Sequence, residues 1–366
     1  MIIDWHTHVH SPREQAAPFW RGQCPATIDN VLRLHDEVGL DISVISNSGH
    51  YLKEYTRDEA LPAIREANQY LAALRDQHKG RLVALAVAIP GGGDAHLREL
   101  ERAVKEDDLR GVLISSSHRR AYPDDDDARP FFRLACDLDI PVFMHPPSVG
   151  FGEERMKEFR LASSVGRPFD SCLALARLIV RGVFEELPQL KFVASHLGGG
   201  ICEIIGRMDY AYELRDNPLI LGPYGPPVYI TRKPSDYLRM LYFDTVSYHA
   251  PAVECAIKTV GVDRMIFGTD SPMLVALKRR GLDLIDQVGL SAADKLVVVA
   301  YALECSVDLR IDILPSEKVP HAVQSDMGGA VVEHLVLRVP AGKFRADQVP
   351  RKAHQLVTLN RVFFVF

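Results

Sequence analysis

The chain has no long apolar segment and no strong excess of either charge. Among its 366 residues there is no run of about eighteen apolar residues, the length that a membrane-spanning helix needs. A formal net charge of -5 gives no electrostatic reason to expect nucleic acid or an anionic membrane surface as a partner. We therefore expect neither a membrane protein nor a nucleic-acid-binding protein.

The chain also lacks paired cysteines. Its six cysteines are scattered and none belongs to a Cys-x-x-Cys motif: Cys24, Cys136, Cys172, Cys202, Cys255 and Cys305. In a chain of this length they are typical of reduced, mostly buried thiols. The short apolar start leads at once into charged and imidazole side chains, so we expect no signal peptide. These features predict a cytoplasmic protein.

Short apolar runs alternate with amphipathic segments along most of the chain. The eight runs are 1–6, 42–46, 82–88, 110–115, 140–145, 190–195, 241–246 and 264–269. Most are continuously apolar, which is typical of parallel strands covered on both faces. The helical segments between them include 58–78, 95–107, 130–138 and 172–187. This order predicts an α/β fold, and eight repeats favour a TIM (β/α)8 barrel over a doubly wound open sheet.

The alternation of apolar runs and amphipathic segments ends well before the last residue. We expect residues 1–295 to form the barrel as a catalytic domain and residues 296–366 to form an atypical C-terminal segment of unknown role. The latter is rich in Pro and Val and has little helical period after residue 297. It is either a genuine extension or an altered C-terminus, and the sequence leaves both open. Residues 214–236, rich in Pro, Gly and Tyr, are expected to form a long connection over the barrel mouth.

Four of the eight runs end in residues that can bind a metal or carry a proton. The first leads into His6-Thr7-His8, the fifth ends at His145, the sixth at His196 and the eighth at Asp270. Alternate side chains of a strand share a face, so His6 and His8 project to the same side. Active sites of (β/α)8 barrels lie at the C-terminal ends of the strands, so these side chains are predicted to meet.

Three imidazoles and one carboxylate, those of His6, His8, His145 and Asp270, form a plausible ligand set for one divalent ion. We expect Zn²⁺, with Mn²⁺ as the alternative. Such an ion lowers the pKa of its water from about 15.7 to about 7. His196 is then the general base and acid beside that water, because its ordinary pKa is close to working pH. Asp4 lies one step deeper, and a hydrogen-bonding role is favoured for it over direct ligation.

The motifs resemble the amidohydrolase superfamily, and most of all its aminocarboxymuconate-semialdehyde decarboxylase-like branch. The resembling segments are Asp4–His8, Val165–Pro168, Gly182–Lys191, Ser195–Gly200 and Ile266–Pro272, within roughly 1–295. The resemblance implies zinc ligation by His6, His8, His145 and Asp270, and catalytic roles for His196 and Asp270. It also implies that Arg207 holds a substrate carboxylate, reaching from the neighbouring subunit of a homodimer. Arg167 and Phe169 are further candidates for substrate contact.

The implied reaction is loss of carbon dioxide from a small unsaturated or aromatic carboxylic acid. In this hypothesis the protein is a metal-dependent, non-oxidative decarboxylase that uses a metal-bound hydroxide and His196. The end of the fourth run, Ser115–His118, contains no lysine that could bridge two metals, which favours a single ion. The same ligands serve a hydrolase acting on a lactone or an amide, so this alternative stays open. A third hypothesis is a non-enzymatic barrel disabled by its altered C-terminus.

Overall fold

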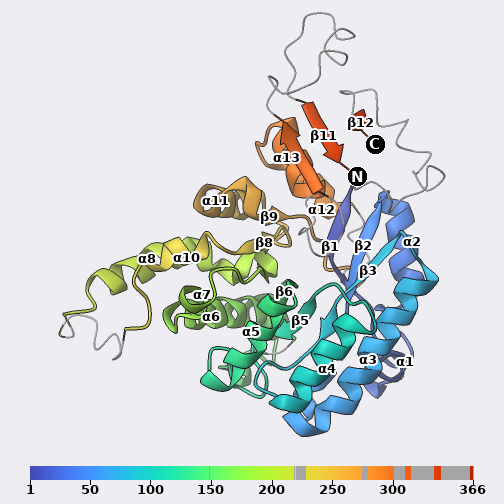
Figure 1. The fold of residues 1–366 in the computed structure, drawn as a ribbon, viewed down its shortest axis with the longest axis horizontal. Helices are drawn as coiled ribbons and strands as arrows, with labels where there is room; N and C mark the ends of the chain where they lie inside the picture. The colour runs from blue at the N-terminus through green and yellow to red at the C-terminus, as the bar shows by residue number, and fades with distance from the viewer. Residues whose placement is uncertain are drawn as a thin grey trace, which may run out of the picture.

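The structure is a computed structural model that describes residues 1–147, 149–217, 219, 228–273 and 279–300, together with the backbone of 310–314, 334–338 and 363–365. Parallel strands alternate with helices through the first 300 residues (Figure 1). The strands are β1 (Ile3–His8), β2 (Ile42–Ser46), β3 (Leu82–Ala84), β4 (Ala86–Val87), β5 (Val112–Ser115), β6 (Val142–His145), β7 (Phe192–Ala194), β8 (Tyr242–Asp244) and β9 (Met265–Ile266). Each of the eight expected runs therefore contains strand.

The strands close into a barrel through two backbone junctions. One sheet has the order β1-β2-β3 and the other runs from β4 to β9 in sequence order, all parallel. Only Leu85 separates β3 from β4, and its amide donates to Ile45 O at 3.0 Å, so these two strands are halves of one. At the other seam Trp5 N donates to Phe267 O at 2.9 Å and His8 N to Ser271 O at 2.7 Å. The expected (β/α)8 barrel is confirmed.

The helices cover the outside of the strands. They are α1 (Pro12–Gln15), α2 (Ile28–Val38), α3 (Arg57–Gln77), α4 (Asp94–Lys105), α5 (Arg129–Asp137), α6 (Arg167–Val180), α7 (Val183–Glu186), α8 (Ile201–Glu213), α10 (Pro234–Leu238), α11 (Ala250–Val260), α12 (Arg280–Gln287) and α13 (Ala292–Ala300). Figure 1 shows α2, α3 and α4 along the outer side of β1–β3. The expected helix 172–187 is interrupted because Gly182, at φ +74°, ends α6 and begins α7.

The barrel interior is a packed apolar core. Its fully buried members come from all around the barrel: Ile3, Trp5, Val44, Leu85, Leu113, Phe143, Val193 and Ile266. A second, larger cluster fills the layer between the strands and the helices. The polar side chains at the C-terminal ends of the strands therefore rest on a dry, rigid layer, which fixes their positions.

The C-terminal part contains more regular structure than its composition predicts. Helix α13 runs to Ala300, and Phe267 N donates to Val298 O at 3.0 Å, so this helix joins the barrel wall. Beyond it, β10 (Arg310–Leu314) pairs antiparallel with β11 (His334–Arg338), and β12 (Phe363–Val365) pairs parallel with β11. Much of the expected connection 214–236 lies outside the described residues. No helix among the described residues is long and apolar enough to cross a membrane.

Candidate metal centre

The four predicted metal ligands converge at the mouth of the barrel. His6 Nε2 lies 3.0 Å from His8 Nε2, which lies 3.3 Å from His145 Nε2. Asp270 Oδ1 lies 3.3 Å from His6 Nε2 and 3.4 Å from His8 Nε2. Two of these histidines end β1 and one ends β6, while Asp270 follows β9 across the closing seam. Residues far apart in the sequence therefore meet at one point.

The outer ring nitrogens of two histidines are already occupied. His6 Nδ1 lies 2.6 Å from Asp244 Oδ2, and His8 Nδ1 lies 3.2 Å from Ser46 Oγ. A neutral imidazole has one donor and one acceptor nitrogen, so an Nδ1 that donates outward leaves a lone pair on Nε2. These lone pairs face one another and the carboxylate of Asp270. The donor set fits a divalent cation, which binds neutral imidazole and carboxylate.

The charges around the cluster also favour a cation. Burial lowers the pKa of His8, and it lowers the pKa of His145 well below the usual value, so both rings are neutral. Burial opposes the charged form of His6, but the carboxylates of Asp270 and Asp244 raise its pKa to about 10. Although burial alone would raise it, the neighbouring imidazoles hold the pKa of Asp270 well below its usual value. The two carboxylates thus stabilise positive charge at this point.

His196 stands beside the cluster at the start of a tight turn. The turn, His196–Gly200, follows β7, and His196 itself adopts a left-handed backbone at φ +54°. Its Nε2 lies 3.4 Å from Asp270 Oδ2, and one ligand atom each from His6, His145, His196 and Asp270 all lie within 4.8 Å of one another. Its side chain is 17% exposed, whereas that of His6 is fully buried. His196 therefore contacts the cluster and is also partly accessible to solvent.

Asp244 is a functional residue that the sequence reasoning missed. This fully buried residue contacts His6 Nδ1 through Oδ2 and accepts a hydrogen bond from His196 N at 2.7 Å through Oδ1. One carboxylate thus orients a predicted ligand and the predicted proton carrier together. The sequence contains a pattern that indicates this residue, because Tyr242-Phe243-Asp244 is an apolar run that ends in a carboxylate, as the run before Asp270 does.

Asp4 joins the two sides of the closing seam rather than facing the cluster. Its carboxylate accepts from His6 N at 3.0 Å and Thr7 Oγ1 at 3.0 Å on β1. It also accepts from Thr269 N at 3.1 Å and Thr269 Oγ1 at 2.5 Å. Burial raises the pKa of Asp4 to about 6. The expected hydrogen-bonding role agrees with this geometry, which fixes Asp270 relative to His6.

The three candidate substrate-binding residues occupy different positions. Arg167 is the first residue of α6 and half-buried; burial lowers its pKa while the charge of Asp270 acts in the opposite direction. Phe169 is 53% exposed on the same turn. Arg207 is exposed on α8, and within the described part of the chain it forms no ion pair. No hydrogen bond, ion pair or ring contact joins the cluster to Arg167, Phe169 or Arg207; Arg167 is next to Pro168, whose carbonyl oxygen packs against Gly199 in the turn that begins with His196.

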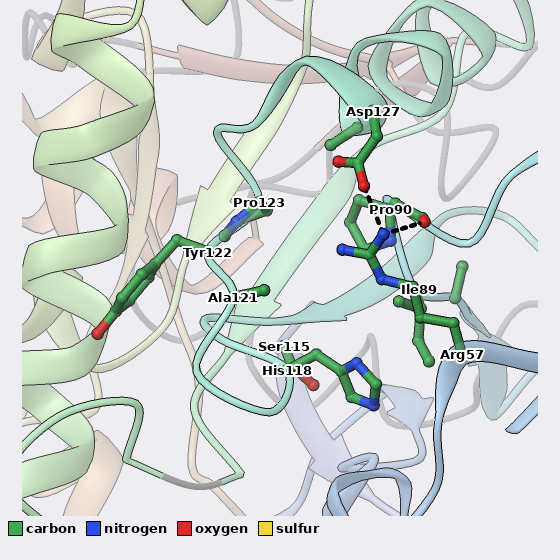
Figure 2. Close-up of a pocket in the computed structure, with 12 residues that line it drawn as sticks. Arg57, Ile89, Pro90, Ser115, His118, Ala121, Tyr122, Pro123 and Asp127 are labelled. Carbon is green, nitrogen blue, oxygen red and sulfur yellow. Dashed lines mark hydrogen bonds and ion pairs between the residues drawn. The ribbon is translucent and has the colours of Figure 1, made fainter.

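A small pocket beside the mouth is not the substrate site. It lies between the start of α3 and the segments that follow β4 and β5 (Figure 2). Arg57 crosses it, donating to Gly91 O at 2.5 Å and to Asp127. Its volume of about 20 Å³ holds roughly one water molecule, and none of the residues that line it belongs to the histidine cluster.

A family model described as amidohydrolase matches residues 3–295. The chain belongs to the amidohydrolase family. The resemblance inferred from the sequence motifs is thereby confirmed, and the match covers all the residues of the cluster.

Several curated relatives of the chain are named as decarboxylases, and one as a hydratase. The chain is 28% identical over 238 residues to a 2-amino-3-carboxymuconate-6-semialdehyde decarboxylase of Dictyostelium discoideum, covering 64% of this chain and 63% of that protein. It is 26% identical over 256 residues to a gamma-resorcylate decarboxylase of Rhizobium sp., covering 67% and 76%. A solved dihydroxybenzoic acid decarboxylase of Polaromonas sp., with bound manganese and the inhibitor 2-nitroresorcinol, superposes with a TM-score of 0.69 at 23% identity, covering 81% and 94%. That likeness shows the barrel fold.

Proposed function

We propose that this protein is a metal-dependent, non-oxidative decarboxylase of a small aromatic or unsaturated carboxylic acid. The observation that carries the proposal is the convergence of three Nε2 atoms and one carboxylate, with His196 Nε2 beside them. One divalent ion is held by His6, His8, His145 and Asp270. The decarboxylase names of the relatives favour this activity over the hydrolase alternative.

Different residues of the chain are proposed to bind the substrate and to transfer the proton. A divalent ion supplies Lewis-acid stabilisation of negative charge on substrate oxygen atoms when it is bound. Arg167 binds a negatively charged substrate group, and Phe169 contacts the substrate ring at the edge of the site. His196 Nε2 delivers a proton to the carbon that bears the carboxylate, with Asp270 stabilising the charged imidazole. The bond from that carbon to the carboxylate then breaks, so that the substrate carboxylate and the one proton delivered by His196 become the decarboxylated product and carbon dioxide.

The test is a panel of hydroxybenzoic acids, muconic acids and lactones, followed for carbon dioxide release and for ring opening. Release of carbon dioxide by the wild type and its loss in His196→Asn, with metal content retained, support the decarboxylase. Turnover of lactones without carbon dioxide would support the hydrolase instead. A purified protein without metal, and without activity after addition of zinc or manganese, would favour a non-enzymatic barrel.

For the ion we favour Zn²⁺, with Mn²⁺ as the competitor. Imidazole-rich sites suit zinc, whereas the Polaromonas relative contains manganese. Elemental analysis of protein purified without added metal, followed by reloading of the stripped protein with each ion, distinguishes the two. Higher activity with manganese at equal occupancy would reverse this choice.

A homodimer is the proposed assembly, with Arg207 serving the neighbouring site. Exposed apolar side chains surround this arginine on α8 and extend onto α6: Ile204, Tyr210, Leu173 and Phe169. Apolar patches of this kind are typical of interfaces between subunits. If Arg207 acts across the interface, mixing the inactive variants Arg207→Ala and His196→Asn restores activity to roughly a quarter of wild type, because half of randomly formed dimers are mixed and contain one complete site. No restoration, or a monomer by light scattering, would contradict this.

Two further expectations belong to the proposal. The five described cysteines are free, which is compatible with a cytoplasmic location. The catalytic domain is proposed to comprise residues 1–295, with 296–366 as a separate segment, although α13 crosses this boundary. Truncation after residue 300, compared with truncation after residue 295, tests which boundary yields a folded and active barrel.

A further inference from the structure

The carboxylate of Asp170, on the first turn of α6, is completely buried and joins three segments of the barrel mouth. It accepts hydrogen bonds from Ser116 Oγ at 2.5 Å and from Ser117 Oγ, Tyr122 OH and Gly150 N at 2.7 Å each. The two serines and the tyrosine follow β5, whereas Gly150 follows β6. Among the described residues no basic side chain forms a salt bridge with Asp170.

A buried carboxylate without a basic partner needs hydrogen bonds from neutral donors to replace those that it would form with water. Here four donors converge, as many as its oxygen lone pairs accommodate. Figure 2 shows the Tyr122 ring directed away from Arg57 and Asp127, and its hydroxyl is the one that reaches Asp170. A Cβ at Gly150 would lie 2.8 Å from Asp170 Oδ1, so the close approach of this backbone requires glycine.

The first turn of α6, which contains Asp170, also contains Arg167 and contacts the turn that begins with His196. Arg167 lies one helical turn before Asp170, at the start of α6. On the neighbouring side Gly199, in the turn that begins with His196, has φ +68°, and a Cβ there would lie 1.7 Å from Pro168 O. The first turn of α6 is thus fixed by hydrogen bonds at Asp170 and by direct backbone contact with the His196 turn.

We infer that Asp170 is a positioning residue that fixes Arg167 at the substrate-binding side of the site. Its four hydrogen bonds set the direction of the first turn of α6, and this direction sets the position of the guanidinium relative to the histidine cluster. The inference rests on the proposed function, in which Arg167 binds a negatively charged group of the substrate. Asp170 itself contacts no ligand of the predicted metal.

A double-mutant cycle tests whether Asp170 acts through Arg167. Asp170→Asn and Arg167→Gln are each expected to raise KM about tenfold with kcat changed less than about threefold, and the double variant should raise KM little more than either alone. Tyr122→Phe, which removes one donor and keeps the charge, should raise KM by a smaller factor. Independent effects of Asp170→Asn and Arg167→Gln that multiply in the double variant would overturn the inference.

Asp124→Asn is the matched control. Asp124 is equally buried and also bonds α6, but at its opposite end, where it accepts from Arg177 Nε at 2.7 Å. Asp124→Asn and Asp170→Asn should both lower Tm, and only Asp170→Asn should raise KM. An equal rise in KM for the two variants would show that general weakening of α6, not the position of its first turn, is responsible.

Hydrogen–deuterium exchange separates this inference from the proposed function. Asp170→Asn should increase amide exchange in the first turn of α6, and Asp124→Asn in its last turn. If the wild type decarboxylates no acid of the panel, the wild type, the two single variants and the double variant are compared instead by their Kd for 2-nitroresorcinol. Unchanged exchange in the first turn of α6 in a folded Asp170→Asn protein would overturn the inference, whether or not the protein is a decarboxylase.

Discussion

Carboxylates near the barrel mouth are held in two different ways. Around the histidine cluster, Asp270 and Asp244 contact imidazole nitrogens. At the start of α6, Asp170 contacts only hydroxyl groups and a backbone amide, and Glu14 is bonded by Ser11 N and Asn47 Nδ2. A carboxylate beside imidazoles attracts positive charge, whereas a carboxylate among neutral donors fixes the positions of loops. The first region is therefore suited to an ion and the second to shaping the space next to it.

Metal removal should have the largest effect on activity, and it should act through the carboxylates of the histidine cluster alone. Stripping with a chelator is expected to abolish carbon dioxide release and to lower Tm, because an ion present at about 100-fold over its Kd stabilises the folded state by about 2.7 kcal/mol. Addition of zinc or manganese should restore both. Calorimetry of Asp170→Asn should show the same loss of Tm on chelation, and His6→Asn should show none. A chelation response retained by His6→Asn would place the ion elsewhere.

Gly199→Ala should disturb the contact between the two regions. The new Cβ would collide with Pro168 O, and the left-handed backbone adds about 1–2 kcal/mol of strain, so we expect a loss of at least about 3 kcal/mol in the free energy of unfolding and low activity. Denaturant titration measures the loss. Gly206→Ala on α8 is the control: nothing lies within 4 Å of its Cβ position, and its stability should be unchanged or higher. Equal effects of the two substitutions would contradict the proposed packing.

Asp244→Asn should weaken metal binding without removing a ligand. Loss of the carboxylate beside His6 Nδ1 is expected to lower metal affinity about 10- to 100-fold. Competition with a fluorescent chelator measures this affinity. In the same assay Asp170→Asn should bind the metal as wild type does. A similar loss in both variants would remove the distinction between the two kinds of carboxylate.

Glu14→Gln should change the pH dependence of stability. Burial raises the pKa of Glu14 from 4.5 to about 7 in the folded protein. The folded state then holds more protons than the unfolded state between these values, so this group lowers stability as pH rises from 4.5 to 7. Glutamine can keep both hydrogen bonds through Oε1. The variant should therefore gain, relative to wild type, about 3 kcal/mol above pH 7 and little below pH 4.5. The measurement is urea unfolding of both proteins at one pH above 7 and one below 4.5. The same difference in stability between Glu14→Gln and wild type at the two pH values would refute this prediction.

Much of the barrel, and the residues that form the histidine cluster, were predictable from local patterns. Continuous apolar runs identified the strands, and the residues that follow them identified His6, His8, His145, His196 and Asp270. Asp244 shared this pattern and was overlooked. Asp170 could not have been found in this way, because its partners come from segments 20 to 54 residues away and none of them forms a recognisable motif. The interruption at Leu85 was also hidden, since one apolar run covers β3 and β4.

The amino-acid sequence alone determined the order of strands and helices and the chemical types placed after the strands, because these depend on periodicity within short segments. Only the tertiary structure decided how closely those side chains approach one another, that Asp244 joins them, and which ring nitrogen of His6 and of His8 faces the cluster. The reason is closure of the barrel: the hydrogen bond from Trp5 N to Phe267 O and the bonds from Asp4 to Thr269 bring the two ends of the domain together. These hydrogen bonds across the closing seam join residues more than 260 positions apart, and no local pattern predicts them.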